Sequence, residues 1–548
     1  LQGRRKILWV SKNDPLVEDA RRDWSALGGR PNQVVPQSRF PLGSKIPLAE
    51  GILFTTYATL RSGPRGEKAS RLAQVLEWLG SDFDGLIIFD EAHAMANAAG
   101  EKGARGDRGP SEQGRTGLRL QNALPNARVL YVSATGATVV SNLGYASRLG
   151  LWGAASFPFP TRASFVAAME AGGVAAMEVL ARDLKALGLY TARSLSYAGV
   201  EYEILEHELT PEQTEIYDAY ADAFSIIHNN LEAALRLTNI SSDSGATLNG
   251  NAKGAARSAF ESAKQRFFGF IVTSMKMPTV LRQIQRDLDD GLAPVIQLVT
   301  TGEALMERRL AEIPVSEWGD IQVDVTPREY VLDYLMNSFP IALHEVFSDE
   351  EGNLRSRIAM QDGQPIVCQA ALEKRNEMME YLGALPAVHS ALDQLIHHFG
   401  TDLVAEVTGR SRRIVKRVSF DGARLAVERR PASANRDETT AFMDGKKPII
   451  VFSDAGGTGR SYHADRGAKN QSRRAHYLLE TGWKADAAVQ GLGRTNRTNQ
   501  VHAPLLRPVA TNGSSTANTT NGTSTTIRLS RYDGGTCETA TSASSASR

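Results

Sequence analysis

The stretch around which the chain is organised is Leu86-Ile87-Ile88-Phe89-Asp90-Glu91-Ala92-His93, an apolar run that ends abruptly in two carboxylates and a histidine. A short apolar run bounded by polar residues is typical of a buried parallel strand. In an open α/β sheet, ligands bind beyond the carboxyl ends of the strands. Asp90 and Glu91 are therefore predicted to lie where the metal ion and phosphates of a nucleotide would bind. A surface Asp-Glu pair after a core strand is the ordinary alternative.

The composition sets outer limits on the class of protein. The 548 residues are enough for two or three domains, and 62 basic residues nearly cancel 61 acidic ones. Any nucleic-acid binding must therefore come from local basic patches. Cys368 and Cys537 cannot form a disulfide framework or a zinc site by themselves, which fits a reducing compartment.

The sequence also suggests where the protein works. No apolar run approaches the length of a membrane-spanning helix and there is no signal peptide, so we expect an intracellular protein without a membrane. Its Ala-, Gly- and Arg-rich composition favours a bacterial or phage source and the cytoplasm, whereas a eukaryotic protein would be nuclear. Because the chain opens at Leu1 and not at methionine, we expect a fragment whose natural start lies upstream.

Apolar segments alternate with helical patterns twice along the chain. The first series of predicted strands covers 7–11, 51–57, 86–89 and 128–135, and the second covers 294–299, 403–407, 448–453 and 475–479. Such alternation predicts a doubly wound parallel sheet with helices on its faces. Two series predict an α/β protein with two similar halves in tandem.

Composition shifts suggest where these halves begin and end. We expect a first lobe at 1–160, a helical connecting region at 161–290, and a second lobe at 291–511. An insertion of helices and short strands at about 313–385 interrupts the second lobe. Residues 512–548 are rich in Ser and Thr and almost free of apolar periodicity, so they form a disordered or aberrant tail.

Two further motifs lie in the second half. Gln490-Gly491-Leu492-Gly493-Arg494-Thr495-Asn496-Arg497 carries two arginines three residues apart, one of which could act as an arginine finger. A solvated basic helix end is the alternative. The glycines of Asp454-Ala455-Gly456-Gly457-Thr458-Gly459-Arg460-Ser461 would let backbone amides approach a phosphate, although a Gly-rich turn is more often only a turn.

Taken in order, these motifs resemble those of superfamily-2 helicases and translocases. Asp-Glu-Ala-His at 90–93 is followed by Ser-Ala-Thr at 133–135, the Gly-rich loop and the Gln490 to Arg497 motif. Motifs of the strawberry notch family resemble the residues at 452–465 and 491–500 and those at 9–12 and 132–138. This resemblance covers Ile7 to Pro508. It implies two tandem RecA-like domains that hydrolyse ATP with Mg²⁺. Hydrolysis would be coupled to movement on nucleic acid or to its remodelling, and DNA is a more expected partner than RNA.

The resemblance assigns roles at an ATP site between the lobes. Asp90 of the DEAH box would hold Mg²⁺, and Glu91 would polarise the water that attacks the γ-phosphate. Arg494 and Arg497 would contact that phosphate from the second lobe, with Gln490 positioning the water or the ribose side.

Other residues would link the nucleotide to the second lobe and to nucleic acid. His93 would couple the nucleotide state to the second lobe together with Ser133, Ala134 and Thr135. The residues implied to touch the nucleic-acid backbone are Ser11, Lys12, Thr55, Thr56, Tyr57, Gly457, Thr458, Gly459 and Arg460. Contacts of this kind position a strand without reading its sequence.

One departure from the family pattern bears on activity. No Gly-x-x-x-x-Gly-Lys-[Ser/Thr] loop, which anchors the β- and γ-phosphates, occurs in the sequence. We therefore expect this fragment to hydrolyse ATP poorly or not at all. The rival hypotheses are a non-catalytic helicase-like scaffold or transcriptional co-regulator, and an α/β enzyme that uses the acidic pair for other metal chemistry. Gly491 also replaces a basic residue of some relatives, which favours a translocase over a strand-separating helicase.

A basic cluster runs from Arg410 to Arg417 in the second lobe. A solvated face is the ordinary interpretation of such a cluster. Since it follows a predicted strand, tracking the phosphates of nucleic acid is the alternative.

Overall fold

The computed structural model describes residues 3–64, 66, 69–98, 109–133, 140–153, 157–192, 196–311, 313–319, 326–419, 422–431, 433–454, 459–482 and 485–511. Among the predicted site residues, Ala134, Thr135, Gly457 and Thr458 lie outside these ranges, as does the tail from 512.

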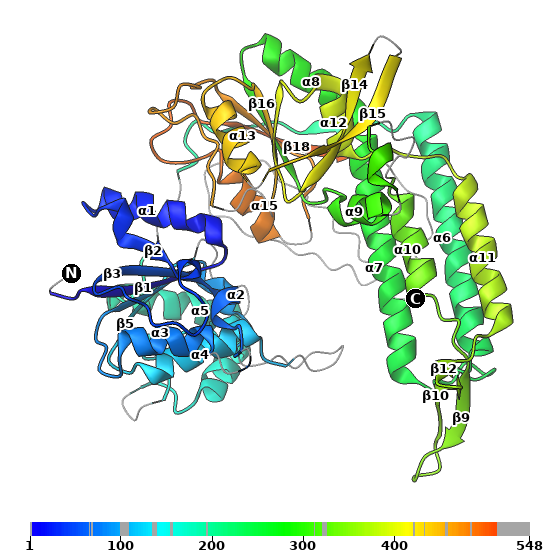
Figure 1. Ribbon diagram of the computed structural model, residues 1–548, viewed down its shortest axis with the longest axis horizontal. Helices are drawn as coiled ribbons and strands as arrows, with labels where there is room; N and C mark the ends of the chain where they lie inside the picture. The colour runs from blue at the N-terminus through cyan, green and yellow to red at the C-terminus, as the bar shows by residue number, and fades with distance from the viewer. Residues whose placement is uncertain are drawn as a thin grey trace.

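The first lobe is a five-stranded parallel sheet in the order β2-β3-β1-β4-β5. Its strands are β1 (Lys6–Ser11), β2 (Val34–Pro36), β3 (Gly51–Thr56), β4 (Leu86–Phe89) and β5 (Arg128–Tyr131). Helix α1 (Val17–Ala26) covers one face, while α3 (Arg71–Leu79) and α4 (Glu112–Ala123) cover the other (Figure 1). Alternate strand residues feed these two cores, as expected of a sheet buried on both sides.

The second lobe repeats this plan with the strand order β13-β16-β8-β17-β18-β6, and β7 also pairs with β18. The strands are β6 (Glu201–Tyr202), β7 (Leu205–His207), β8 (Ala293–Leu298), β13 (Val404–Val407), β16 (Ile449–Ser453), β17 (Arg474–Leu478) and β18 (Leu505–Thr511), all paired in parallel. Helices α8 (Met277–Asp289) and α12 (Ala391–Phe399) pack on one face and α13 (Ala434–Met443) on the other. The α/β prediction with two doubly wound parallel sheets is confirmed.

Residues 201–207 depart from the predicted boundaries. They were expected in the helical connecting region, yet β6 and β7 pair with β18 in the second-lobe sheet. Strand β18, which the sequence analysis did not predict, lies about 300 residues further along the chain. A pairing over such a separation leaves no local trace in the sequence.

The predicted connecting region and the predicted insertion fold together as one helical bundle. Its helices are α6 (Pro211–Leu237), α7 (Gly250–Met275), α10 (Arg328–Asn337) and α11 (Gln369–Ala384). They share one apolar core that contains Phe224, Phe267 and Leu335. The hairpin of β9 (His344–Ser348) and β10 (Leu354–Ile358) lies at the bundle's far end (Figure 1).

A second hairpin, β14 (Arg412–Ser419) with β15 (Gly422–Arg429), forms a separate antiparallel sheet on the second lobe. Further helices within the described ranges include α2 (Tyr57–Leu60), α9 (Glu303–Ala311) and α15 (Ala485–Leu492). Short elements are the strands β11 (Met360–Gln361) and β12 (Gln364–Pro365) and the 3-10 turns Asp14–Leu16, Pro31–Gln33, Gln37–Arg39, Ala92–Met95, Val140–Tyr145, Ser147–Leu149 and Val315–Glu317.

Helix α5 (Arg162–Ala186) corrects one expectation about the membrane. Within the described ranges it is the one helix long and apolar enough, by length and composition, to cross a membrane. The sequence analysis found no apolar run of that length. The backbone leaves helical conformation at Gly173, where φ is 59° and ψ is −147°. This break divides α5 into two parts, each shorter than the roughly 20 residues of a membrane span.

Candidate functional site between the lobes

Asp90 follows directly on β4 at the carboxyl edge of the first sheet. Its amide donates to the Val10 carbonyl over 2.8 Å, and its Oδ2 accepts the hydroxyl of Ser11 at 2.7 Å. The hydroxyl of Tyr57 donates to the Asp90 carbonyl at 2.9 Å. Neighbouring segments therefore fix both the backbone and the carboxylate at the place where α/β sheets bind ligands.

Glu91 has a backbone conformation that is uncommon for a residue with a side chain. Its φ of 50° and ψ of 48° lie in the left-handed region, at a cost of about 1–3 kcal/mol. The turn brings Glu91 Oε2 to 3.2 Å from Nδ1 of His93, and that nitrogen lies 3.1 Å from Oγ of Ser133. His93, which the sequence assigns to the same coupling motif as Ser133, thus contacts Ser133 directly.

The charge environment of Glu91 comes from both lobes. Burial first, and then the neighbouring carboxylate of Asp90, raise the pKa of the Glu91 carboxyl above its ordinary value. The positive charges of Lys12, Arg494 and Arg497 oppose this rise. The structure therefore brings the acidic pair of the first lobe within electrostatic reach of the arginine pair of the second.

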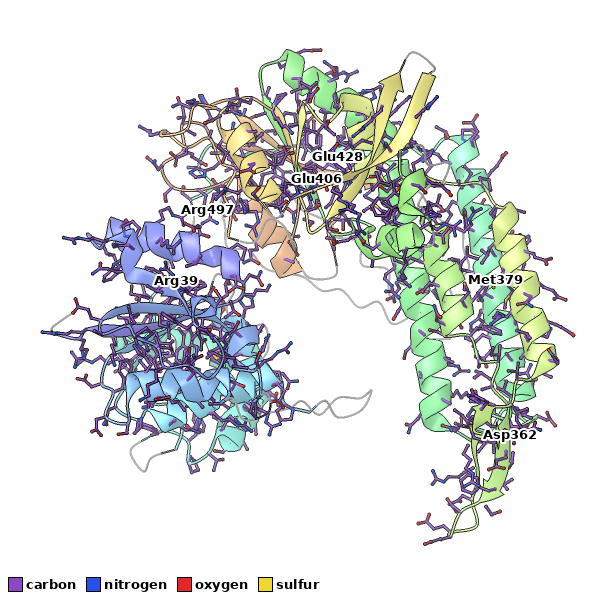
Figure 2. The ribbon with its side chains drawn as sticks, in the orientation of Figure 1. Arg39, Asp362, Met379, Glu406, Glu428 and Arg497 are labelled. Carbon is purple, nitrogen blue, oxygen red and sulfur yellow. The ribbon has the colours of Figure 1, made fainter. Side chains whose placement is uncertain are left out.

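The two arginines have different surroundings. Arg494 is 6% exposed, donates from Nη1 to the Arg460 carbonyl at 2.9 Å, and has its guanidinium 5.7 Å from the ring centre of Phe452. Arg497 is exposed and is held through Nε by the carbonyl of Gly493 at 2.8 Å. Arg497 lies on the side of the second lobe that faces the first (Figure 2). Its terminal nitrogens are thus better placed than those of Arg494 to meet a ligand.

Gln490, one helical turn before Arg494, lies half-buried near the end of α15. The turn after α15 contacts the buried His476 of β17, which was not predicted from the sequence. A ring nitrogen of His476 lies 2.7 Å from Thr495 Oγ1, and the other lies 3.2 Å from Gln297 Oε1. Burial, and secondarily the charge of Arg494, lower the pKa of His476 to about 3, so it is neutral at physiological pH. A histidine inside an otherwise apolar strand was the signal in the sequence.

The absence of a side chain at Gly491 is explained by the closeness of Gln297, the partner of His476. A Cβ at this position would lie 2.2 Å from the side-chain amide of Gln297. The extra basic residue of some relatives therefore has no room unless Gln297 and its bond to His476 move.

The lobes approach each other closely at Gly459. This residue has φ of 76°, and a Cβ on it would lie 2.1 Å from Leu16 Cδ2 and 2.5 Å from Asp19 Oδ2. Asp19 pairs with Arg22 on α1 at 2.6 Å. Partial burial is the main cause that lowers the pKa of Arg497, followed by the nearby cations Arg494 and Arg22. Helix α1 of the first lobe thus borders the arginine side of the site.

Four residues predicted to touch nucleic acid are buried. Ser11 donates to Asp90, Thr55 donates to Gln37 at 2.6 Å, Thr56 caps α2 and Tyr57 reaches the Asp90 carbonyl. Each is 3% exposed or less, so direct contact with a strand does not fit this structure. Their hydroxyls fold inward because each finds a hydrogen-bond partner within the lobe.

The other predicted nucleic-acid contacts have mixed surroundings. Lys12 is exposed, but it lies close enough to influence the charge of Glu91. Arg460 points Nη1 inward, to the Asn435 carbonyl at 3.1 Å and Thr439 Oγ1 at 3.2 Å.

The oxygen ligands at Asp90 suit Mg²⁺. In the part of the chain that is described, no group of three or more His, Cys, Asp or Glu side chains could hold a metal ion alone. Mg²⁺ is usually held by one or two carboxylates together with substrate phosphates and water. A single carboxylate beside the Ser11 hydroxyl fits that pattern.

Two family models match parts of this chain. Residues 1–219 match the family model described as "P-loop containing NTP hydrolase pore-1". Residues 390–520 match the model described as "C-terminal domain on Strawberry notch homologue". The two matches cover the acidic pair and the arginine pair respectively.

Similar proteins occur in plants and animals. Protein FORGETTER 1 of Arabidopsis thaliana is 30% identical over 93% of this chain and 47% of its own length. Protein strawberry notch homolog 1 of Rattus norvegicus is 33% identical over 92% of this chain and 44% of its own length. The chain thus spans about half the length of the curated relatives it matches. It belongs to the strawberry notch family of helicase-like P-loop proteins.

Proposed function

We propose that this chain is part of a nucleic-acid translocase or helicase that hydrolyses ATP between its two lobes. The observation that carries the proposal is the position of Glu91, whose carboxylate lies within electrostatic reach of Arg494 and Arg497. An acidic pair on one lobe and an arginine pair on the other match the needs of phosphoryl transfer, which are positioning and charge stabilisation.

Each side chain has a distinct role in the proposed reaction. Asp90 would hold Mg²⁺, which would neutralise charge on the phosphates. Glu91 accepts the proton of the attacking water, and its raised pKa suits a general base. Arg497 contacts the γ-phosphate, while the buried Arg494 positions the turn. Gln490 orients the water or the ribose.

Coupling to nucleic acid extends this proposal. His93 and Ser133, with the following Ala134 and Thr135, relay the nucleotide state to the second lobe. We assign contacts with the nucleic-acid backbone to Gly457, Thr458, Gly459 and Arg460, of which the first two lie outside the described residues, and DNA is the preferred substrate. We place the protein inside the cell, with lobes at 1–160 and 291–511.

A non-catalytic scaffold or transcriptional co-regulator is the second candidate. These 548 residues contain no Gly-x-x-x-x-Gly-Lys-[Ser/Thr] run, so the two candidates differ in whether the full-length protein carries one elsewhere. Without the lysine and its amide cradle, the β- and γ-phosphates lack their main anchor.

ATP hydrolysis by the purified full-length protein, with and without single-stranded DNA, duplex DNA and RNA, separates the two candidates. The translocase proposal expects hydrolysis that nucleic acid stimulates. The scaffold proposal expects no hydrolysis above a buffer control in any of these conditions.

Residues 1–548 alone are expected to hydrolyse ATP poorly or not at all, because this sequence lacks the phosphate-anchoring loop. Phosphate release by the purified chain, measured at saturating ATP with and without DNA, checks this. Robust DNA-stimulated release from residues 1–548 would contradict it.

A further inference from the structure

The β14–β15 hairpin concentrates positive charge on a chain that is otherwise nearly neutral. Residues 412–430 contain seven Arg or Lys and two Asp or Glu, against a net charge of +1 for all 548 residues. The register places Arg417 directly opposite Arg424, and Arg412 opposite Arg429. Like charges directly across two strands destabilise a sheet.

The inner like-charge pair is accommodated by the protein itself. Trp318 contacts both arginines, with its ring centre 5.0 Å from the guanidinium group of Arg412 and 5.6 Å from that of Arg429. Arg412 also pairs with Glu307 of α9. The base of the hairpin is thus a folded part of the lobe and not a free charge cluster.

Lys416 and Arg417, further from the base, have no such partners. Both side chains are exposed, and neither makes a hydrogen bond or ion pair with another described residue. As adjacent residues of a strand they point to opposite faces of the hairpin. The outer half therefore offers positive charge on both faces.

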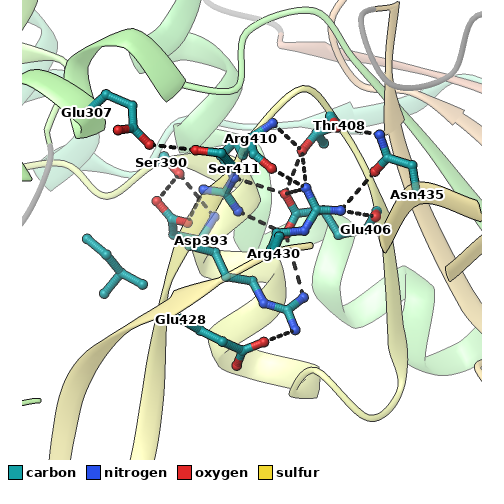
Figure 3. Close-up of polar contacts among 12 residues, drawn as sticks. Glu307, Ser390, Asp393, Glu406, Thr408, Arg410, Ser411, Glu428, Arg430 and Asn435 are labelled. Carbon is teal, nitrogen blue, oxygen red and sulfur yellow. Dashed lines mark hydrogen bonds and ion pairs between the residues drawn. The ribbon is translucent and has the colours of Figure 1, made fainter. Parts of the chain in front are cut away.

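A buried polar network holds the base of the hairpin rigidly (Figure 3). Arg410 donates to Glu406 at 2.9 Å and to Asp393 at 2.7 Å. Arg413 of β14 bonds Glu428 of β15 at 2.7 Å and lies 3.7 Å from Glu406. The β14–β15 hairpin is therefore attached to β13 and α12 through hydrogen bonds that are shielded from solvent.

The same network continues towards the arginine side of the nucleotide site. Arg430, at the end of β15, donates to Asn435 Oδ1 at 2.9 Å. The carbonyl of Asn435 accepts from Arg460 at 3.1 Å, and the Arg460 carbonyl accepts from Arg494 at 2.9 Å. Hydrogen-bonded residues thus link the base of the hairpin with Arg494.

We propose that the β14–β15 hairpin binds the phosphate backbone of nucleic acid, through Lys416 and Arg417 and without reading sequence. The proposal rests on the proposed function and assigns it a contact outside the helicase-like motifs. The hairpin leaves from the carboxyl end of β13, the edge of the parallel sheet at which ligands bind. Rigid mounting reduces the entropy that binding would cost.

A polyanion with regularly repeated charges is the occupant that this surface fits best. Exposed lysine and arginine on both faces suit a phosphate backbone. An acidic protein segment is the competing occupant, and the experiment distinguishes the two because it measures nucleic acid directly.

The test is equilibrium binding of residues 1–548 to fluorescein-labelled single-stranded DNA, duplex DNA and RNA of equal length, by anisotropy over a series of salt concentrations. The double variant Lys416→Ala/Arg417→Ala is expected to bind about tenfold more weakly at low salt, with the slope of log K against log salt reduced by about 2 for duplex DNA. Its melting temperature is expected to stay unchanged, since neither side chain has a partner among the residues that the structure describes.

Lys446→Ala/Lys469→Ala is the matched control, because it removes two exposed charges from the same lobe where Asp444 is nearby. Unchanged affinity and slope for the control, with loss in the hairpin variant, support the proposal. Equal binding by the hairpin variant and the wild type overturns it while leaving the proposed function intact. Absence of binding by the wild-type chain to all three nucleic acids overturns both.

Discussion

Replacing Arg497 with alanine is expected to lower kcat for ATP hydrolysis by the full-length protein by roughly 10³-fold or more, with a smaller change in KM. An arginine finger stabilises charge that develops on the transferred phosphoryl group, so its loss acts mainly on the transition state. Arg497 is exposed and anchored only through its Nε and backbone, which leaves its terminal nitrogens available. Steady-state kinetics at saturating nucleic acid measures the effect.

Arg497→Lys tests the geometry of the same contact. Lysine keeps the charge but lacks the planar fork, so this variant is expected to recover only part of the rate. Arg436→Ala, an exposed arginine on α13, is the control and is expected to match the wild type. Hydrolysis by Arg497→Ala within threefold of the wild-type rate would exclude a finger role.

Glu406→Gln is expected to lower the free energy of unfolding of the second lobe by about 3–5 kcal/mol, because it removes the buried anion that Arg410 and Arg430 share. Glu406 lies at the end of β13 and is fully buried (Figure 2). Its carboxylate accepts from Arg410 and from Thr408 at 2.6 Å. Denaturant titration followed by circular dichroism measures the loss.

The same carboxylate predicts a dependence of stability on pH. Burial alone would raise the pKa of Glu406, but Arg410 and Arg430 outweigh it and bring the pKa down to about 2. A group whose pKa is lower in the folded than in the unfolded state stabilises the fold above its unfolded value. This contribution is therefore complete above about pH 4.5 and is lost as the pH falls towards about 2.

Glu428→Gln is the matched control for this prediction. Glu428 pairs with Arg413 on the hairpin but is one-third exposed, so its loss is expected to cost about 1 kcal/mol or less. Equal midpoints of unfolding for Glu406→Gln and Glu428→Gln would contradict the central position of Glu406 in the network.

Local sequence patterns were sufficient to predict the acidic side of the site. The apolar run before Asp90 marks a buried strand, and the topology of parallel sheets then places Asp90 and Glu91 at the ligand edge. Motif order added Arg494 and Arg497. The different surroundings of these two arginines could not be predicted, because Arg494 is buried by Phe452 and Arg460, whose positions depend on the folded lobe.

The basic cluster at 410–417 shows the limit of such patterns. A solvated face was the ordinary interpretation, yet Arg410 and Arg413 are buried and ion-paired. Their partners come from β13, α12 and β15, which are separate segments of the chain. Only Lys416 and Arg417 keep the exposure that the pattern suggested. Non-local ion pairs decide which charges remain available to a ligand.

The most direct measurement of the central claim is single-turnover ATP hydrolysis by the full-length protein beside its Glu91→Gln variant. Glutamine preserves size but cannot accept the proton of water. The account predicts that the variant still binds ATP and hydrolyses it about 10²-fold or more slowly, as expected for loss of a general base. Equal hydrolysis rates for the two proteins would contradict an inter-lobe site built on Glu91.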